Sequence, residues 1–422
     1  MKVNTEKLSV SNERLSIIGR LIGIYREERR DNSQNSWTQK RFCKDICSPN
    51  TLKNIEAGGL SRSIEIYVEM LDKFDLKLGE FPEIDKAMYR LTEELYEATE
   101  DYNLEKIIGL SNKILRILNE VSDYIYYSEL KELFENIKNH YGNKMMIKDE
   151  VIEKYKQLLS VLPDCFKDMI RLLVYLKIKA NSVADKNLYK RLVEDIDLIN
   201  CSHEFVKINL IDFYYIMGNY KKMELLINNL IKYFQGKRRF IRLLDAYNYA
   251  IVLFSELEFE KCLQYIKESE AIVSENILPE TKVSEYYTNV AYAYHLNEQY
   301  ENALNYYYKG LQQEHRDFID SYMFMADCQN RLNLPIDIPF VDEDVYVQYP
   351  IDVKYMYKYF TFDNSVPDFV KENYILKKIV PLLTDPEYIK VFRYEILRLV
   401  NKSGHYKCTY MFESLVEKNI KK

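Results

Sequence analysis

Three side chains that could read nucleic acid occur within five consecutive positions, at Asn50, Lys53 and Asn54. Asparagine and lysine are residue types that bind base edges and phosphates. Spacings of three and four residues place all three on one face of a helix. The opposite face carries Leu52 and Ile55, which we expect to be buried. The pattern predicts a helix that reads DNA.

Two short helices joined by a tight turn must position these side chains, within the segment Trp37 to Gly58. Thr38 can cap the first helix, which we expect from Gln39 to Ile46. Ser48 can cap the second helix, and Pro49 would take its first position, where the missing N–H is not needed. The candidate DNA-contacting residues are Thr38, Gln39, Ser48, Asn50, Thr51, Lys53 and Asn54.

Two further helices should complete this unit, one from Asn12 to Arg30 and one from Ser63 to Phe74. The first of them has an apolar stripe with arginines around it. Those arginines are Arg14, Arg20, Arg26, Arg29 and Arg30. A short turn from Leu76 to Pro82 closes the unit. We expect residues 1–80 to form a small DNA-binding domain.

The run TQKRFCKDICSPNTLKNIEAG at residues 38–58 resembles the helix-turn-helix of the Xre and phage-repressor superfamily. Within it, ICSPNTLKNIEAG is similar to the form in bacterial peptide-pheromone receptors of the Rgg, PlcR, NprR and PrgX type. The resemblance implies an ion pair between Arg26 and Glu56, and DNA-backbone contacts near Gln39. The loop before Thr38 is longer than in that superfamily. An open alternative is a degenerate motif that only packs against another surface.

Composition favours an all-α protein of more than one unit. The chain has 422 residues, 47% of them apolar, with only 11 glycines and 10 prolines, which argues against a turn-rich β fold. The formal charge of −6 is uneven, because residues 1–62 hold 12 basic and 7 acidic side chains. A basic head on an acidic body suits a head that meets phosphate.

Cysteine usage and the N-terminus predict a cytoplasmic protein. The seven cysteines follow no framework spacing, which is typical of reduced thiols in a cytosol. The first ten residues, MKVNTEKLSV, lack the apolar core of a signal peptide. No apolar run approaches the length of a membrane span, so we expect no membrane partner.

Residues 83–422 should form successive helix pairs, because small and aromatic residues recur there in the spacing of a tetratricopeptide repeat. The clearest copies lie within residues 203–312. Their key positions are Ile211, Tyr214, Tyr220, Met223, Ile227 and Leu230; Ala250, Leu253, Phe259, Cys262, Ile266 and Ser269; and Ala291, Tyr294, Tyr300, Ala303, Tyr307 and Gly310. The anchors Tyr220, Phe259 and Tyr300 are 39 and 41 residues apart, more than the usual period of about 34.

Such pairs stack on one another because each has too little core to stand alone. We therefore expect a right-handed superhelix whose inner helices line a concave groove. The C-terminal region should add further degenerate repeats and a polar cap, with a possible dimer surface. Its expected helices are Asp352–Phe362, Val366–Leu383, Pro386–Asn401 and His405–Lys418.

An asparagine stands two positions before the small residue of each clear repeat, at Asn209, Asn248 and Asn289. An amide side chain both donates and accepts hydrogen bonds, so a column of amides could hold an extended peptide by its backbone. Nearby side chains could supply pockets or further contacts: Tyr215, Tyr247, Phe254, Tyr287 and His295. In the resembling receptors, asparagines on inner repeat helices grip the pheromone. The alternatives are solvated or helix-bonded asparagines and a buried core histidine at His295.

Enzymatic and metal-binding patterns are missing from the sequence. It has no glycine-rich phosphate loop. The five histidines are far apart, and no spacing of His and Cys fits zinc. Cys43 and Cys47 lie one helical turn apart with nothing nearby to complete a metal site. We expect no catalytic activity, metal or cofactor.

The resulting hypothesis is a cytoplasmic transcription regulator that responds to a short signalling peptide. The peptide would bind the repeat groove and alter the geometry of a homodimer, and with it the spacing of two DNA-binding heads on a palindromic operator. The alternative is an adaptor that sequesters a regulatory protein through its repeats.

Overall fold

The protein is all-helical, as its composition predicts. The computed structural model describes residues 10–32, 37–182, 185–313, 319–347, 349–363 and 365–420. Within these ranges every named element is a helix, and an isolated bridge between Lys77 and Tyr124 is the nearest approach to a sheet. No helix in the described ranges combines the length and apolar character needed to cross a membrane.

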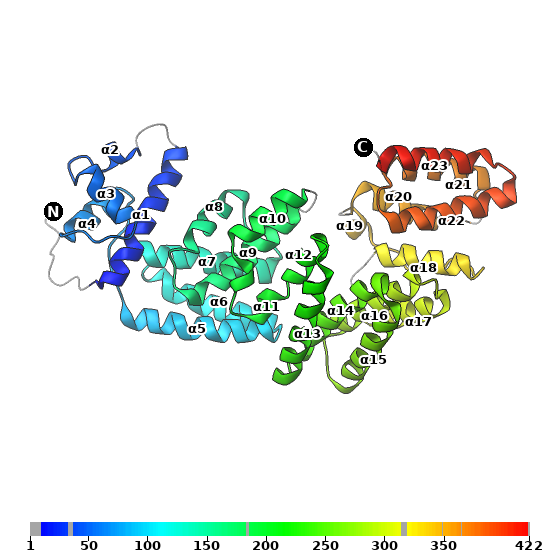
Figure 1. Cartoon of the computed structure of the whole chain (residues 1–422), viewed down its shortest axis with the longest axis horizontal. Helices are drawn as coiled ribbons and strands as arrows, with labels where there is room; N and C mark the ends of the chain where they lie inside the picture. The colour runs from blue at the N-terminus through cyan, green and yellow to red at the C-terminus, as the bar shows by residue number, and fades with distance from the viewer. Residues whose placement is uncertain are drawn as a thin grey trace. The chain divides into compact units, whose positions relative to one another are not determined.

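The chain forms two compact units, Met1–Arg242 and Leu243–Lys422. The first unit contains the basic head together with the helices that follow it, so the expected boundary at residues 80–83 falls inside this unit. The second unit begins at the first helix of the second clear repeat. Figure 1 labels the helices of both units in chain order.

Four helices make up the head: α1 (Asn12–Asn32), α2 (Gln39–Phe42), α3 (Pro49–Glu56) and α4 (Glu65–Asp72). All four expected helices are present, although α2 is much shorter than predicted. The core of the head consists of the apolar faces of α1, α3 and α4. Its most deeply buried side chains include Ile18, Leu21, Ile22, Leu52, Ile55, Tyr67, Met70 and Leu71.

Helix α2 is shorter than predicted. It ends at Phe42, and turns follow instead of a helix to Ile46. The reason is local, because Asp45 adopts a left-handed conformation with φ of 65°, which an α-helix cannot include. Residues 33–36 of the long loop before Thr38 lie outside the described residues.

Helices of the first unit continue after the head, from which residues 73–81 separate them. Their bounds are α5 (Pro82–Glu100), α6 (Leu104–Asn119), α7 (Ile125–Asn143), α8 (Asp149–Leu158), α9 (Asp164–Ser182), α10 (Lys186–Asp195), η1 (Leu198–Asn200), α11 (Glu204–Lys207), α12 (Leu210–Ile216) and α13 (Tyr220–Lys237). Helices α5, α6 and α7 pack in sequence, and α9 contacts both α5 and α7. One continuous core runs from the head to Phe213.

The second unit has the clearest helix pairs. Its elements are α14 (Phe240–Leu257, which begins three residues before the unit boundary), α15 (Phe259–Glu275), α16 (Glu280–Leu296), α17 (Tyr300–Leu311), α18 (Ile319–Arg331), α19 (Glu343–Tyr346), α20 (Ile351–Phe360), α21 (Asp368–Tyr374), η2 (Ile375–Ile379), η3 (Val380–Leu382), α22 (Pro386–Ser403) and α23 (Lys407–Ile420). The small repeat residues Ala250, Ala291 and Ala303 are fully buried. They allow the helices to approach closely.

Each aromatic anchor of the repeat pattern begins a helix. Tyr220, Phe259 and Tyr300 are the first residues of α13, α15 and α17. The pattern therefore located the second helix of each pair correctly. The predicted single helix at Val366–Leu383 is instead broken into α21, a π-helical turn and a 3-10 turn. Pro381 explains the break, because it has no N–H with which to continue the helix.

Candidate functional site

The outer face of α3 carries the predicted polar side chains. Asn50, Lys53 and Asn54 are exposed, whereas Leu52 and Ile55 have no solvent exposure. The start of the helix is fixed by its cap, since the Ser48 hydroxyl accepts a hydrogen bond from the Thr51 N–H at 3.1 Å. The predicted two-sided character of this helix is confirmed.

An ion pair fixes α3 to α1. The Arg26 guanidinium bonds both carboxylate oxygens of Glu56, Nε to Oε1 at 2.5 Å and Nη2 to Oε2 at 3.0 Å. Arg26 is 2% exposed, and its Nη1 also donates to the Trp37 carbonyl. The Gln39 amide donates to Glu56 Oε2 at 2.8 Å. The pairing that the resemblance implied is confirmed, and it also holds the start of α2.

Most candidate residues of this surface are already engaged with the protein. Gln39 and Ser48 make the bonds described above, and the Thr51 hydroxyl lies 2.9 Å from the Ser48 hydroxyl. Thr38 makes no side-chain cap bond, and its backbone carbonyl instead accepts from Arg41 and Phe42, so the expected hydroxyl cap is wrong. The Asn54 amide donates to the Leu60 carbonyl at 3.4 Å. Asn50 and Lys53 remain the exposed polar side chains on α3 with no assigned partner among the described residues.

Exposed basic side chains that the candidate set omitted lie close to this helix in the sequence. Lys40, Arg41, Lys44 and Arg62 are all exposed. They flank α3 in the sequence on both sides, in the turns and short helix that lead into it and in the loop that follows. The net charge of residues 1–62 was the signal that could have found them, since each lies in that segment. Such residues can neutralise phosphates without reading bases.

In the second unit, α14 and α16 run side by side in the same direction. Near their starts, Lys282 Nζ lies 2.8 Å from Asp245 Oδ1. Near their ends, the Asn297 amide donates to the Ser255 carbonyl at 2.9 Å. Two of the three predicted amides, Asn248 and Asn289, lie between these links on neighbouring helices.

Asn248 has hydrogen-bonding capacity that the protein does not use. Its side chain is 6% exposed, and both its Oδ1 and Nδ2 are buried without a hydrogen-bond partner in the described chain. A buried amide without partners is destabilising, and proteins retain such groups rarely. Asn289 on α16 is partly exposed. The two helices thus carry one buried amide without a partner and one partly exposed amide.

Asn209 does not belong to this pair. It lies in the first unit, in the turn between α11 and α12, and not in the middle of an inner helix. Its amide donates to the Val206 carbonyl at 3.0 Å. The expectation of three equivalent helical positions is therefore wrong at Asn209, because the first helix of this repeat is broken into two short pieces.

Three of the candidate aromatic side chains pack between the helices of a pair. The Tyr247 hydroxyl donates to Glu268 on α15 at 3.1 Å, and Phe254 packs on Tyr265 of the same helix. The Tyr287 ring contacts Tyr306 of α17. Tyr247 and Phe254 are buried in this packing and Tyr287 is partly exposed, so their expected role as groove pockets stays a prediction. Tyr215, on α12 of the first unit, is exposed.

His295 is a buried core histidine, which was the alternative to a groove position. It is 7% exposed, and its Nε2 lies 2.8 Å from Asp327 Oδ2 of α18. The same carboxylate oxygen accepts from Arg331 Nε at 2.9 Å. The aspartate and the histidine are 32 residues apart in sequence, so no local spacing could predict the pair.

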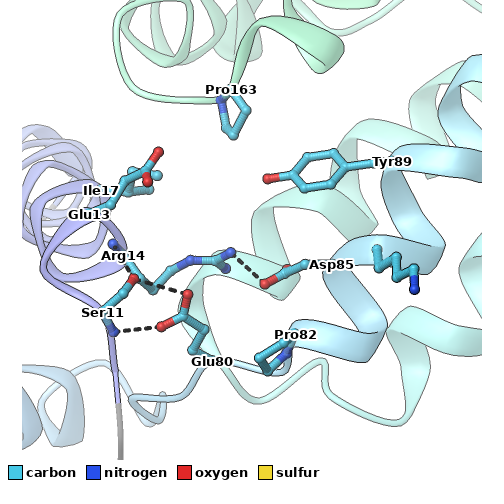
Figure 2. Close-up of a pocket in the computed structure, with 10 residues that line it drawn as sticks. Ser11, Glu13, Arg14, Ile17, Glu80, Pro82, Asp85, Tyr89 and Pro163 are labelled. Atoms are coloured by element: carbon cyan, nitrogen blue, oxygen red, sulfur yellow. Dashed lines mark hydrogen bonds and ion pairs between the residues drawn. The ribbon is translucent and has the colours of Figure 1, made fainter.

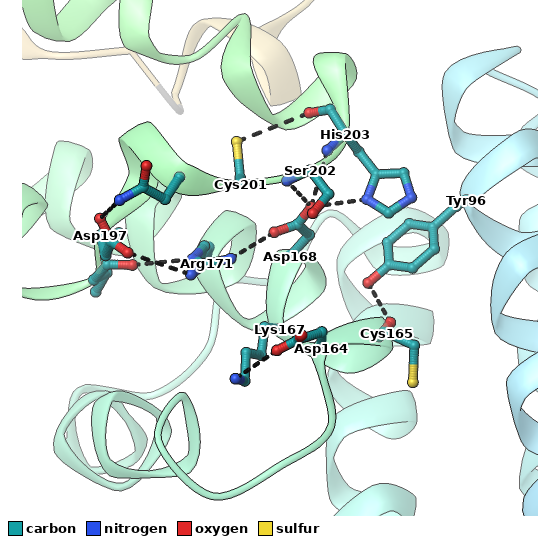
Figure 3. A network of polar contacts seen from close by, with 12 residues as sticks. Tyr96, Asp164, Cys165, Lys167, Asp168, Arg171, Asp197, Cys201, Ser202 and His203 are labelled. Atoms are coloured by element: carbon teal, nitrogen blue, oxygen red, sulfur yellow. Dashed lines mark hydrogen bonds and ion pairs between the residues drawn. The ribbon is translucent and has the colours of Figure 1, made fainter.

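A second unpredicted pair, Asp168 and His203, lies in the first unit (Figure 3). Asp168 Oδ2 accepts from His203 Nδ1 at 2.7 Å and from the Ser202 and His203 backbone N–H groups at 2.7 and 3.0 Å. Arg171 Nη1 donates to the other oxygen at 2.8 Å. Burial opposes ionisation, yet these hydrogen bonds lower the pKa of Asp168 below its ordinary value. The Tyr96 ring stacks on the imidazole at 3.9 Å.

This network ties α9 to the chain before α11. It brings no activated nucleophile to His203, because burial raises the pKa of the neighbouring Cys201 thiol to about 12 and keeps the sulfur protonated. The hydrogen bonds of Asp168 hold the loop at Ser202 and His203 against α9. In the described part of the chain, no three His, Cys, Asp or Glu side chains gather in a way that could hold a metal ion.

Comparison with protein-family models, curated proteins and solved structures finds no match to this chain.

Proposed function

We propose that this protein is a DNA-binding transcription regulator whose second unit binds a short peptide. The observation that carries the proposal is the exposed polar face of α3, which presents Asn50 and Lys53 while the opposite face is buried. Helices α2 and α3 act as a helix-turn-helix, with α3 in the major groove. The ion pair between Arg26 and Glu56 sets the angle of that helix.

Charge supports DNA as the partner of this face. Residues 1–62 carry a net charge of +5 within a chain of net charge −6. Lys40, Arg41 and Lys44 lie just before α3 and are exposed, so they can contact phosphates while Asn50 and Lys53 contact bases. An asparagine amide pairs well with adenine, and a lysine with guanine.

The unused amide of Asn248 supports a peptide as the second ligand. A peptide backbone offers an N–H and a C=O, which are the two partners that this side chain lacks. Asn289 on the parallel helix α16 supplies a second amide for the same bound peptide. Stacked repeat pairs provide an extended concave surface for such a ligand. The proposed protein is a cytoplasmic homodimer that reads a palindromic operator and responds to the peptide through its dimer geometry.

The DNA assignment is tested by measuring the affinity for a random-sequence duplex library and for the sequences selected from it. Lys53→Ala and Asn50→Ala should each weaken binding to selected sequences about 5- to 100-fold, the loss expected for one base contact. Lys113→Ala is the matched control, since Lys113 is an exposed lysine of α6 in the same unit. Equal affinities for all four proteins would overturn the assignment.

The peptide assignment is tested by native mass spectrometry of protein purified from its own cells. A bound mass of a few hundred to about a thousand daltons should accompany the wild type and be lost from Asn248→Ala and Asn289→Ala. Asn302→Ala is the control, because Asn302 is an exposed asparagine of α17. Copurification of a protein in place of a peptide would favour the adaptor alternative.

A further inference from the structure

Helix α1 belongs to the core of the head. Ile18, Leu21 and Ile22 are completely buried in it. The backbone of α1 also approaches α3 closely, since a Cβ on Gly19 would lie 2.4 Å from the Ile55 carbonyl oxygen. Helix α3 cannot turn without carrying α1 with it.

The start of α1 is anchored to α5 and α7 by a buried arginine (Figure 2). Arg14 is 5% exposed, and its Nη2 lies 2.8 Å from Asp85 Oδ2 of α5. Its guanidinium carbon lies 3.5 Å from the centroid of the Tyr126 ring of α7. The Tyr127 hydroxyl donates to the other oxygen of Asp85 at 3.0 Å. Arg14, one of the arginines expected around the apolar stripe of α1, is therefore a buried residue.

The second anchor lies further along α1. The Tyr25 hydroxyl donates to Glu129 Oε1 of α7 at 2.6 Å, and Lys154 Nζ of α8 lies 2.8 Å from the same oxygen. Glu129 is 1% exposed. Between the two anchors, Arg20 Nη1 donates to the Ser160 carbonyl at 2.9 Å. Side chains of α1 thus bond to α5, to α7 and to the turn after α8.

The two anchors are 11 residues apart on α1, which is about 16 Å along a helix. Attachment at one point would let the head pivot, whereas attachment at two such distant points prevents rotation about either. Both anchors are buried ion pairs or charge-assisted hydrogen bonds, which resist opening because an unpaired charge would be left in the interior.

We propose that the head and helices α5–α8 move as one rigid lever, in which α1 is shared by the DNA-binding head and the helices that follow. The consequence of this inference for operator binding rests on the proposed function. Any signal that alters operator binding then acts by moving the first unit of one protomer relative to the first unit of its partner. It does not act by swinging a head on a flexible tether.

The test is a distance measurement by pulsed electron paramagnetic resonance on the full chain. Genetically encoded nitroxide side chains replace Glu69 of α4 and Glu105 of α6, which are both exposed. Labelled chains are diluted into excess unlabelled protein, so that only the distance within one protomer is measured. We expect one narrow distance distribution, unchanged when a random-sequence DNA duplex is added. A broad distribution, or a shift on adding DNA, would overturn the rigid lever.

Two variants sharpen the test. Tyr25→Phe removes one anchoring hydrogen bond with little change in shape, and Tyr25→Phe combined with Arg14→Ala removes both anchors. The distribution should broaden in Tyr25→Phe, which weakens one anchor, and broaden further in the double variant. Unchanged widths would contradict the role of the anchors. If the double variant fails to fold, the widths of the wild type and Tyr25→Phe still decide the question. A protein that binds no DNA but keeps the narrow distribution would refute the proposed function and leave the lever intact.

Discussion

Arg26 of α1 and Glu56 of α3 form a two-point ion pair that is almost completely removed from solvent. The pair joins residues 30 positions apart and also receives the Gln39 amide of α2. Three of the four helices of the head therefore meet at one carboxylate. Because a guanidinium and a carboxylate match in shape, the pair sets an angle between the helices as well as a distance.

Removal of that carboxylate should destabilise the first unit strongly. Glu56→Ala leaves the buried Arg26 with only the longer contact to Glu27 at 3.5 Å, and we expect a loss of about 3 kcal/mol in the free energy of unfolding. Urea denaturation followed by circular dichroism measures it. Glu69→Ala, at an exposed position of α4, should change stability by less than about 0.5 kcal/mol. Similar values for the two variants would contradict the bracing role.

Two helical glycines should respond in opposite directions to the same substitution. Gly19→Ala would place a methyl group 2.4 Å from the Ile55 carbonyl oxygen, and the overpacking should cost about 1–3 kcal/mol. Gly109→Ala in α6 meets nothing within 4 Å, so it should stabilise by about 0.5–1 kcal/mol through helix propensity. Thermal melting of both variants measures the difference, and a stabilised Gly19→Ala would show that α1 and α3 are further apart.

The Asp168 anchor should make stability depend on acid pH. Its pKa is lowered in the folded protein, so the stability that it contributes is complete above the unfolded value of about 3.9. That stability is lost as the pH falls through the lower folded value. Asp168→Asn should lower the free energy of unfolding at pH 7 by about 2 kcal/mol and flatten its acid dependence. Exposed Asp72→Asn is the control, and equal pH profiles would refute the role of the anchor.

The orphaned amide of Asn248 should be expendable for folding. Asn248→Leu replaces two unpartnered polar atoms with an apolar group of similar shape, which should stabilise the ligand-free protein by about 1–3 kcal/mol. Asn330→Leu is the contrast, because the Asn330 amide donates to the buried Glu395 at 2.8 Å and its loss should destabilise. Calorimetry of the two purified variants decides, and a destabilised Asn248→Leu would indicate an internal role for the amide.

Local signals in the sequence predicted local structure well. Ser48 and Pro49 marked the start of α3, and the aromatic anchors at Tyr220, Phe259 and Tyr300 marked the starts of three helices. Each of these depends on the neighbouring few residues, through a cap or a repeated packing position. The α2 helix was predicted too long because nothing in its composition signals the left-handed conformation of Asp45.

Contacts between distant residues could not be predicted in the same way. Tyr25 meets Glu129 across 104 positions, and Asp168 meets His203 across 35. A single sequence contains no information on which charged residue another will meet, unless a known motif supplies it, as it did for Arg26 and Glu56. For the same reason the sequence left open whether His295 lies in the groove or in the core, and it did not show that Arg14 is buried.

The parallel packing of α14 and α16 has a consequence for ligand length. Packed helices lie about 8–10 Å apart, and an extended peptide advances about 3.3 Å per residue. Amides at Asn248 and Asn289 would therefore hold backbone groups about three residues apart. Under the proposed function, a dipeptide is therefore too short to contact both amides.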